Sequence, residues 1–246
     1  MFLLKSGKIY IYDENSEALV LLDKVLNNKR IDRTNTYKKD IIVDGCDDIL
    51  VSLAECCYPV KGDEIIGNAD SVILQADLHK DIVKRVFKLA EKYNKKLYAL
   101  VSNMQLATER RDFVQHFDCF ICNQQEAGQL FIEDYENMTP EELMPLVQEK
   151  VQRAQIPSMV VTMGGQGAVY VDYDGNVGFC PAKKVQVIDT TGAGDSFCAG
   201  VVSGLTYGKT LAEAVEIGNA LAASVITSME NVCPRFLPGE FGISVD

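Results

Sequence analysis

The sequence predicts an α/β protein whose mostly parallel sheet carries helices on both faces. From about Asn68 onward, short apolar runs alternate with longer stretches whose apolar residues recur at helical spacing. No internal repeat or low-complexity tract interrupts this alternation. Such a rhythm is typical of parallel sheets, because each crossover helix packs back onto a face of the sheet.

The predicted strands are short runs rich in apolar residues. In chain order they cover residues 71–75, 97–101, 118–122, 159–163, 168–172 and 177–179. The last two flank Tyr173-Asp-Gly-Asn176, a turn with the chemistry of a β-hairpin. We therefore expect these two strands to pair with each other.

The predicted helices cover residues 80–93, 124–131, 193–205 and 210–227, and a further helix begins at Thr139. Thr139-Pro-Glu-Glu142 supplies an N-cap, a proline in the first turn and acidic side chains at the positive end of the helix. The 210–227 helix carries small residues that let another element approach closely, namely Gly218, Ala220, Ala222 and Ala223.

Residues 1–67 do not share this rhythm, so the sequence predicts two parts, residues 1–67 and 68–246. Residues 8–12 and 18–22 flank Asp13-Glu-Asn-Ser16 and are expected to form a β-hairpin. Residues 27–40 are polar and rich in lysine and arginine, which is typical of a linker.

The composition narrows the class of protein. Of the 246 residues, 47% are hydrophobic and 24% are charged, and the formal net charge is −11. The negative charge argues against nucleic acid or an anionic membrane surface as a partner, because both attract basic proteins. No apolar run approaches the roughly 20 residues of a membrane span, and the first residues lack the apolar core of an export signal. The expected compartment is the cytoplasm.

The chain contains eight cysteines, which we expect to be reduced in the cytoplasm. Cys119-Phe-Ile-Cys122 has the C-x-x-C spacing of many metal and redox sites. It lies in a predicted strand, however, where side chains three residues apart point to opposite faces. Small buried hydrophobic residues are therefore favoured over a metal or redox site.

The most informative segment is Asp189-Thr-Thr-Gly-Ala-Gly-Asp-Ser-Phe197, which leads into an apolar helix. Gly192 and Gly194 allow backbone angles that a β-carbon forbids, and consecutive amides at a helix start form an anion-binding nest. A carboxylate at Asp195 would repel bound phosphate, but it could take a proton from a hydroxyl while the amides hold a phosphoryl group. A capped helix after a glycine turn is the alternative.

As a block, these nine residues resemble the C-terminal signature of the ribokinase-like (PfkB) family of sugar and nucleoside kinases. The resemblance implies a three-layer ribokinase-like fold and the transfer of a phosphoryl group from ATP to an alcohol. It further implies that Asp195 is the catalytic base, and that the amides of Gly192, Ala193 and Gly194 form the anion hole.

Asn123-Gln-Gln-Glu126 follows one predicted strand and opens a helix. Asparagine is a common N-cap, so the pattern alone leaves a plain helix cap open. At this place in the chain it resembles the family's magnesium motif. That resemblance implies that Glu126 holds Mg2+ through water and that Asn123 contacts a phosphate or a metal-bound water.

A strand that runs into a glycine-rich turn occupies Val160-Val-Thr-Met-Gly-Gly-Gln-Gly167. An ordinary turn at the end of a strand is one interpretation. The resemblance implies instead a loop for the nucleotide phosphates, formed by Thr162, Gly164, Gly165 and Gly167.

Two further features resemble the family. Asn219 and the alanines after it resemble the helix that walls the adenine pocket. Asp189 and Thr191, together with the loop from Ser228 to Pro234, resemble the residues that coordinate a monovalent cation such as K+ in many members.

Residues 42–67 are similar to the cysteine-rich segment of the (p)ppGpp synthetase/hydrolase family, chiefly from Leu53 to Ile65. In that family the paired cysteines work with a later histidine and cysteine. No cysteine occurs between Cys57 and Cys119, although His79 lies near the matching distance. Because structural zinc normally has four ligands, an exposed turn with two partly buried thiols is favoured over zinc, and ligand sensing by this segment stays open.

The family's N-terminal substrate motif, Gly-Gly-x-x-x-Asn, is missing, since no Gly-Gly pair occurs before Gly164. We therefore expect the N-terminal part of the fold to be truncated or diverged, with residues 1–67 of uncertain role. Residues 68–246 are expected to form the nucleotide-binding and catalytic portion. A sheet without its N-terminal strands would expose an unpaired edge and apolar surface, which a homodimer could cover.

The predicted function is ATP-dependent phosphotransfer to a hydroxyl of a sugar or nucleoside, with ATP and Mg2+ as cofactors and K+ as a further candidate. The expected partner is that small-molecule substrate, with no nucleic acid and no membrane. The alternative is a truncated remnant that binds the nucleotide without catalysis.

Overall fold

The computed structural model describes residues 2–5, 8–12, 19–21, 63, 66–75, 80–100, 111–229 and 238–243. The chain forms two compact units, Met1–Leu97 and Tyr98–Asp246. The boundary after residue 67, which is predicted from the change in the pattern of strands and helices along the sequence, stays a prediction. The predicted linker, most of the cysteine-rich segment and His79 lie outside the described residues.

The first unit contains the strands β1 (Phe2–Lys5), β2 (Lys8–Tyr12), β3 (Leu19–Leu21) and β4 (Ser71–Gln75). They pair in the order β3-β2-β1-β4, and each of these pairs is antiparallel. The β2–β3 pair confirms the hairpin expected over residues 8–22. Strand β1 was not predicted, and it gives β4 a neighbour along one edge.

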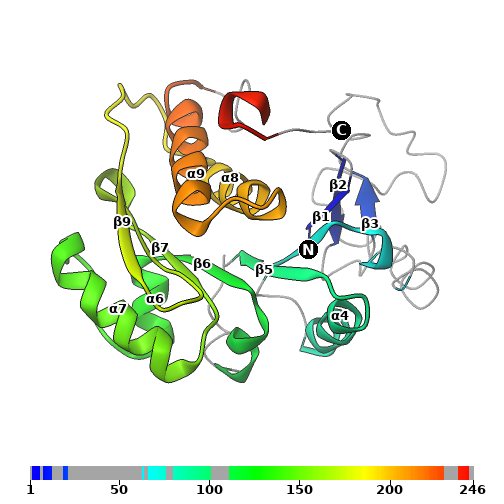
Figure 1. Ribbon diagram of the computed structural model, residues 1–246. Helices are drawn as coiled ribbons and strands as arrows, with labels where there is room; N and C mark the ends of the chain where they lie inside the picture. The colour runs from blue at the N-terminus through cyan, green and yellow to red at the C-terminus, as the bar shows by residue number, and fades with distance from the viewer. Residues whose placement is uncertain are drawn as a thin grey trace. The chain divides into compact units, whose positions relative to one another are not determined.

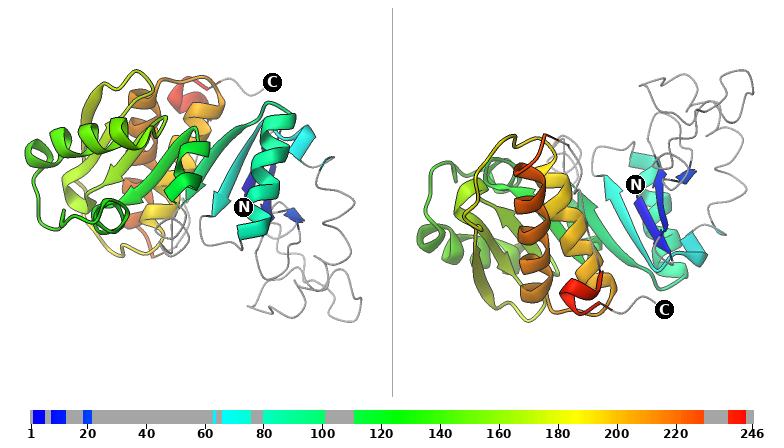
Figure 2. Two further views of the ribbon diagram at one scale, coloured as in Figure 1. Left: turned by 90° about the horizontal axis from the view of Figure 1, so that it is seen from below. Right: turned by 90° about the horizontal axis from the view of Figure 1, so that it is seen from above.

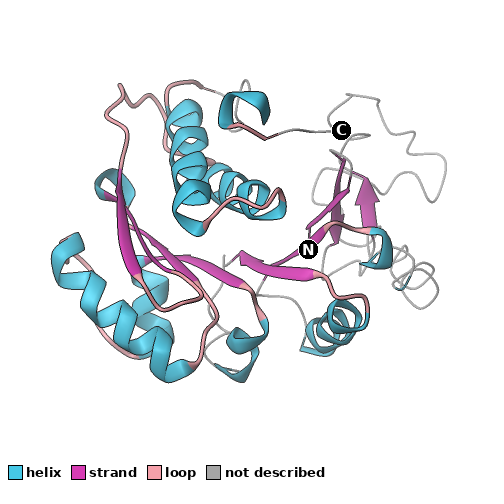
Figure 3. Ribbon diagram, viewed as in Figure 1, coloured by secondary structure: helices cyan, strands magenta, loops and turns pink. Residues whose placement is uncertain are grey.

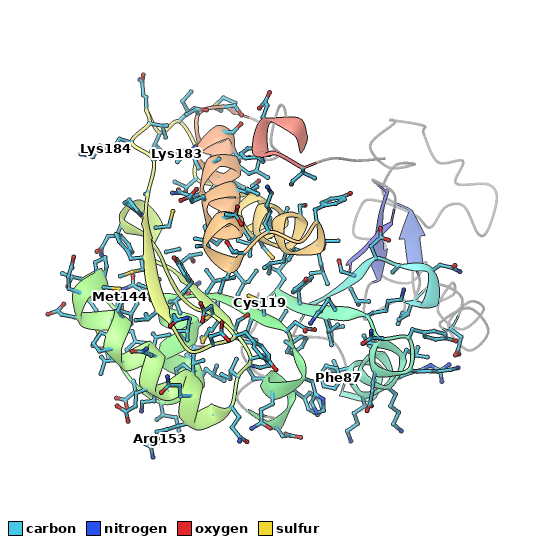
Figure 4. The ribbon with its side chains drawn as sticks, viewed as in Figure 1. Phe87, Cys119, Met144, Arg153, Lys183 and Lys184 are labelled. Carbon is cyan, nitrogen blue, oxygen red and sulfur yellow. The ribbon has the colours of Figure 1, made fainter. Side chains whose placement is uncertain are left out.

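Helix α4 (Lys80–Lys92) lies where the helical spacing predicts it. Its buried apolar side chains recur every three or four residues and include Val83, Val86 and Phe87; Figure 4 labels Phe87 on this helix. Immediately after the helix, the hydroxyl of Tyr93 donates to the Asp63 carboxylate at 2.8 Å. The apolar stripe therefore contributes to the buried core of this unit, and the hydrogen bond from Tyr93 connects the end of the helix to residue 63.

The sheet of the second unit contains β5 (Lys96–Leu100), which begins at the unit boundary, β6 (Cys119–Asn123), β7 (Met159–Thr162), β8 (Gly167–Val171) and β9 (Val177–Pro181). Strands β5, β6 and β7 are parallel. Strands β8 and β9 are antiparallel to their neighbours, because tight turns reverse the chain there. The structure thus confirms the hairpin around residues 173–176 and the α/β class.

The helices among the described residues of the second unit are η1 (Arg111–His116), α6 (Gln124–Phe131), α7 (Pro140–Ala154), η2 (Gly164–Gln166), α8 (Ala193–Thr206), α9 (Leu211–Ile226) and η3 (Pro238–Phe241). Figure 1 and the two views of Figure 2 show α6 and α7 on one face of strands β6 to β9, and α8 and α9 on the other. Both faces of the parallel strands are therefore covered, as predicted.

Three helix starts are fixed by reciprocal capping boxes, in which an N-cap side chain and a glutamate at the third helical position bond to each other's backbone amides. The pairs are Asn123 with Glu126, Thr139 with Glu142, and Thr210 with Glu213. The sequence predicts the N-cap at Thr139, leaves one open at Asn123, and predicts a helix from residue 210. The boxes satisfy amides that have no partner inside the helix.

Helices α8 and α9 lie side by side, as Figure 2 shows, and glycine permits their close contact. A β-carbon on Gly200 would lie 2.6 Å from the Cα of Gly218, and one on Gly218 would lie 2.6 Å from the Phe197 carbonyl oxygen. Real β-carbons do not approach other heavy atoms so closely. Gly218, one of the small residues predicted on the second helix, therefore serves its contact with α8.

The core of the second unit contains apolar side chains and thiols. Cys119, marked in Figure 4, is buried together with Cys122 and Cys198. Burial raises the pKa of the Cys119 thiol to about 12. Among the described residues, no group of three or more His, Cys, Asp or Glu side chains could hold a metal ion. No helix in that part of the chain combines the length and apolarity that a membrane crossing requires.

Candidate active site

The N-terminus of α8 is shaped by Gly192, its N-cap, which has φ 80° and ψ −2°. This left-handed conformation favours glycine, since a β-carbon would be strained there. The Gly192 carbonyl accepts the first helical hydrogen bond from the Ser196 amide at 2.9 Å. The turn therefore delivers the chain into the helix with the first-turn amides at its positive end.

Asp195 lies in this first turn and is exposed. Within the described part of the chain, no hydrogen bond or ion pair engages its carboxylate. The helix N-terminus favours the negative charge. Asp195 is thus an accessible carboxylate at the positive end of α8.

The predicted anion hole is only partly free of internal hydrogen bonds. The Ala193 amide donates to the Thr190 carbonyl oxygen at 3.2 Å. At Gly194, in contrast, no heavy atom apart from the chain neighbours and the backbone of the same helix lies within 4 Å of the position that a β-carbon would take. Space next to the backbone is therefore available at Gly194, where a ligand could approach.

Asn123 and Glu126 stand where β6 passes into α6. The Asn123 side chain accepts from the Glu126 amide at 2.8 Å, and Glu126 Oε2 accepts from the Asn123 amide at 2.7 Å. Burial raises the pKa of the half-buried Glu126 carboxyl, and the bond from the Asn123 amide opposes that rise. The structure therefore confirms the helix cap, while Oε1 makes none of these bonds.

The glycine turn follows β7. The Thr162 hydroxyl donates to the Cys122 carbonyl oxygen at 3.4 Å, which links the ends of β7 and β6. Gly164, at φ 54°, and Gly165 have no heavy atom within 4 Å of a β-carbon position. At Gly167 a β-carbon would lie only 2.1 Å from the Cys180 carbonyl oxygen of β9. Gly167 is therefore required by strand packing, whereas Gly164 and Gly165 adjoin open space.

The register of the sheet brings the two motifs together. Asn123 of β6 is paired with Thr162 of β7 in a parallel ladder. Both strands therefore end at the same edge, where the α6 N-terminus and the glycine turn begin side by side. Ligands of parallel α/β sheets bind at this carboxyl edge.

Asn219 of α9 reaches the end of β9. Its amide nitrogen donates to the Pro181 carbonyl oxygen at 2.6 Å and to Cys180 Sγ at 3.3 Å. Its amide oxygen accepts from the Lys183 amide at 3.4 Å. Asn219 therefore holds the strand end in place, and its predicted contact with adenine stays a prediction.

A loop from residue 182 to 192 connects β9 to α8 (Figure 3). The exposed Lys183 and Lys184, labelled in Figure 4, lie near its start. Further on, Asp189 Oδ1 accepts from both the amide and the hydroxyl of Thr191 at 2.9 Å. The Thr191 amide, followed by its hydroxyl, lowers the pKa of Asp189.

The Ile188 amide donates to the Ile226 carbonyl oxygen at 2.7 Å. This bond places the Asp189 turn next to the end of α9, where the predicted cation loop of residues 228–234 begins. Ser228 and Met229 are described, and the rest of that loop lies outside the described residues.

The predicted residues thus form four groups: the α8 N-terminus, the edge made by Asn123, Glu126 and the glycine turn, the Asp189 turn, and Asn219 at the end of β9. In the described residues no hydrogen bond joins Asp195 to the second group. Sequence reasoning missed Gln124, whose side chain donates to the carbonyl oxygens of Tyr135 and Met138, each at 3.1 Å. In the sequence, the feature that could have drawn attention to Gln124 is its place inside the Asn-x-x-Glu pattern.

Two family models match the chain. The model described as pfkB family carbohydrate kinase matches residues 58–232. The model described as RelA/SpoT RIS domain matches residues 41–71, a short segment that overlaps the first match. The second match agrees with the likeness noted for residues 42–67.

Individual proteins agree with the longer match. The guanosine-inosine kinase of Exiguobacterium acetylicum is 36% identical over 170 residues, which cover 68% of this chain and 54% of that protein. The chain therefore spans about half the length of such relatives.

Solved structures show the fold. The Arabidopsis thaliana ribokinase complexed with ribose and ATP superposes with a TM-score of 0.61 at 23% identity, over 70% of this chain and 54% of that one. A putative sugar kinase from Clostridium perfringens gives 0.65 at 20% identity, over 78% and 60%. The predicted ribokinase-like fold is confirmed. Since the family model covers more than half of the residues, the chain belongs to the pfkB family of carbohydrate kinases.

Proposed function

We propose that the chain transfers the γ-phosphoryl group of ATP to a hydroxyl of a sugar or nucleoside. The observation that carries this proposal is Asp195, an exposed carboxylate in the first turn of α8, directly after a left-handed glycine. Membership of a carbohydrate kinase family supports it. The likeness to a guanosine-inosine kinase adds purine nucleosides to the candidate acceptors.

In the proposed reaction, Asp195 takes the proton of the acceptor hydroxyl. The acceptor oxygen forms a bond to the γ-phosphorus, the bond from that phosphorus to the β–γ bridging oxygen breaks, and its electron pair leaves with ADP. A base of this kind contributes about 10²- to 10⁴-fold to a rate.

The first-turn amides of α8 would hold the negative charge of the transferring group. The Ala193 amide already donates to Thr190. We therefore assign the larger part of this role to Gly194, which adjoins open space. Gly164 and Gly165, which are similarly open, would accommodate the other nucleotide phosphates.

Mg2+ would bind at Glu126 with most of its ligands supplied by water and by ATP. The donor set fits this arrangement, because Glu126 Oε2 accepts from the Asn123 amide while Oε1 makes none of the described hydrogen bonds and could accept from a metal-bound water. Magnesium keeps several waters in such sites. When bound, the ion would neutralise phosphate charge. K+ is proposed at the Asp189 turn, where Asp189 and Thr191 offer oxygen ligands.

The test compares Asp195→Asn with Glu141→Gln, which also removes an exposed carboxylate from the first turn of a helix. Phosphate transfer is measured on a panel of sugars and purine nucleosides, and ATP binding is measured by calorimetry. Asp195→Asn should lose at least about 10²-fold in turnover and still bind ATP, while Glu141→Gln should match the wild type.

Retention of more than about a tenth of the activity by Asp195→Asn would exclude this residue as the base. If the wild type bound ATP but phosphorylated no member of the panel, the alternative of a nucleotide-binding module without catalysis would replace the proposal. Because the chain spans about half the length of this relative, the substrate panel is needed to distinguish the two functions.

A further inference from the structure

We propose that Gln124 is a positioning residue that fixes the glycine turn after β7 relative to the N-terminus of α6, acting through the Met138 carbonyl group. Gln124 is the first residue of α6, next to the N-cap Asn123. The inference about the turn stands on the contacts of the described residues. Its consequence for ATP rests on the proposed function.

Between α6 and α7 the chain makes a tight turn from Tyr135 to Met138. The Met138 amide donates to the Tyr135 carbonyl oxygen at 3.3 Å, and Asn137, the third residue of the turn, has φ 65°. A positive φ at that position is typical of a type II turn and favours asparagine or glycine. The turn lies in the connection between α6 and α7, which brings a compact backbone loop beside the start of α6.

Gln124 is hydrogen-bonded to both ends of this turn. The side-chain nitrogen of Gln124 donates to the Tyr135 and Met138 carbonyl oxygens, each at 3.1 Å. A glutamine amide has two hydrogens, so both are used by the two ends of one turn. Gln124 is half-buried, and in such surroundings an unpaired donor or acceptor costs more than it does in water. The turn is therefore held against the N-terminus of α6.

The Met138 carbonyl group is also hydrogen-bonded to the glycine turn. Gln166 closes η2, and its side-chain nitrogen donates to the Met138 carbonyl oxygen at 3.4 Å. On its other side, the Gln166 carbonyl oxygen accepts from the Ala182 amide at 3.1 Å. The glycine turn is thus attached to the residue that follows β9 on one side and, through Met138, to Gln124 on the other.

These bonds restrict the position of the glycine turn relative to the start of α6. Glu126 and Asn123 are fixed by the α6 cap, whereas Gly164 and Gly165 lie in a short turn with open space around them. Two glycines make such a backbone free to move. A carboxylate and a phosphate loop that serve one nucleotide must keep a constant separation. The ladder pair of Asn123 with Thr162 fixes where the turn begins, and Gln124 supplies a second link at its far end through Met138.

The test exchanges Gln124 for methionine, which keeps the length of the side chain and removes both donors. Gln148→Met is the matched control, because Gln148 is also half-buried and donates to a turn carbonyl, that of Gly175, at 2.8 Å. Amide hydrogen exchange reports each turn separately. The Gln166 and Gly167 amides are bonded within the glycine turn, and the Gly175 amide is bonded within the hairpin turn.

Gln124→Met should speed exchange at Gln166 and Gly167 by roughly tenfold, the factor expected when two hydrogen bonds are lost. Exchange at Gly175 should not change. Gln148→Met should produce the reverse pattern. Equal exchange at the glycine turn in wild type and Gln124→Met, or the same rise at both turns, would overturn the inference.

A second readout is the Kd for a non-hydrolysable ATP analogue with Mg2+. It should rise about five- to tenfold in Gln124→Met, in line with the lost hydrogen bonds, and stay constant in Gln148→Met. Unchanged binding in Gln124→Met would refute the role of this residue in nucleotide positioning. If the wild type itself bound no analogue, the proposed function would fail, while the exchange measurement would still decide what Gln124 does.

Discussion

Gly218→Ala should destabilise the protein, although alanine is the better helix former. Gly218 lies in α9 where that helix meets α8. An added β-carbon would lie 2.6 Å from the Phe197 carbonyl oxygen and 2.8 Å from Cγ2 of Val201. The first of these atoms belongs to the backbone of a helix, so it cannot turn aside as a flexible side chain would.

The size of the effect follows from two opposing contributions. The new methyl group is about 0.8 Å short of an ordinary 3.4 Å contact with the Phe197 oxygen, so the helices must shift. Overpacking of this kind costs typically about 1–3 kcal/mol. Alanine has the higher helix propensity, which by itself would stabilise the protein by about 1 kcal/mol. Because the obstacle is backbone, we expect a net loss of about 1–2 kcal/mol, or roughly 2–8 °C in melting temperature.

Urea and thermal unfolding followed by circular dichroism would measure the loss. Gly194→Ala is the matched control, since it makes the same change in α8 where no heavy atom lies within 4 Å. It should leave stability equal or higher, and yet it should weaken phosphotransfer by placing a methyl group at the proposed anion hole. A Gly218→Ala protein as stable as the wild type would show that α8 and α9 are not packed through their glycines.

Three further predictions concern single residues. Ile132→Gly should stabilise the protein by about 1 kcal/mol in urea unfolding, because Ile132 is 73% exposed and ends α6 at φ 58°, a conformation that costs a β-branched residue about 1–2 kcal/mol; a loss of stability would contradict this. Glu126→Gln should keep the helix cap, since glutamine also serves there, but raise the Mg2+ concentration needed for half-maximal turnover; an unchanged Mg2+ titration would leave Glu126 as a cap alone. Hydrogen bonds from Thr191 lower the pKa of Asp189 below its ordinary 3.8, so the ionised carboxylate stabilises the protein above that value, and this stabilisation is lost as the pH falls through the lower folded pKa. Thermal unfolding between about pH 2 and 6 should therefore show a melting temperature that falls less steeply with acid in Asp189→Asn than in the wild type; parallel curves would refute this.

Local chemistry predicted most of the second unit. Thr139, Pro140 and Glu142 mark the start of α7, and the structure shows that start with its capping box. The signals lie within a few residues of the feature that they predict, so no knowledge of the fold is needed. Strand β1 was missed although Ser6-Gly7, a pair typical of turns, separates its apolar run from β2.

The candidate site depends on contacts that are distant in the sequence, and there prediction was weaker. The sequence offers Gly165 and Gly167 as equivalent members of one loop. The structure separates them, because β9 passes directly against Gly167 and leaves Gly165 open. Nothing local indicates that Gln124 meets Met138, or that Asn219 meets Pro181. Side-chain amides bond to many kinds of backbone group, so their residue type alone does not identify the partner.

The pairing of Asn123 with Thr162 also limits how the chain can change in length. Deleting one residue within β7 would turn every later side chain of that strand to the opposite face, and deleting two would draw the glycine turn back by about 6.6 Å. Either change would separate the turn from the α6 start, even if the sheet still formed. Insertions are therefore expected to be tolerated in the exposed hairpin turn at residues 173–176 and rejected within β6 and β7, so strand length sets the spacing of the site as firmly as residue identity does.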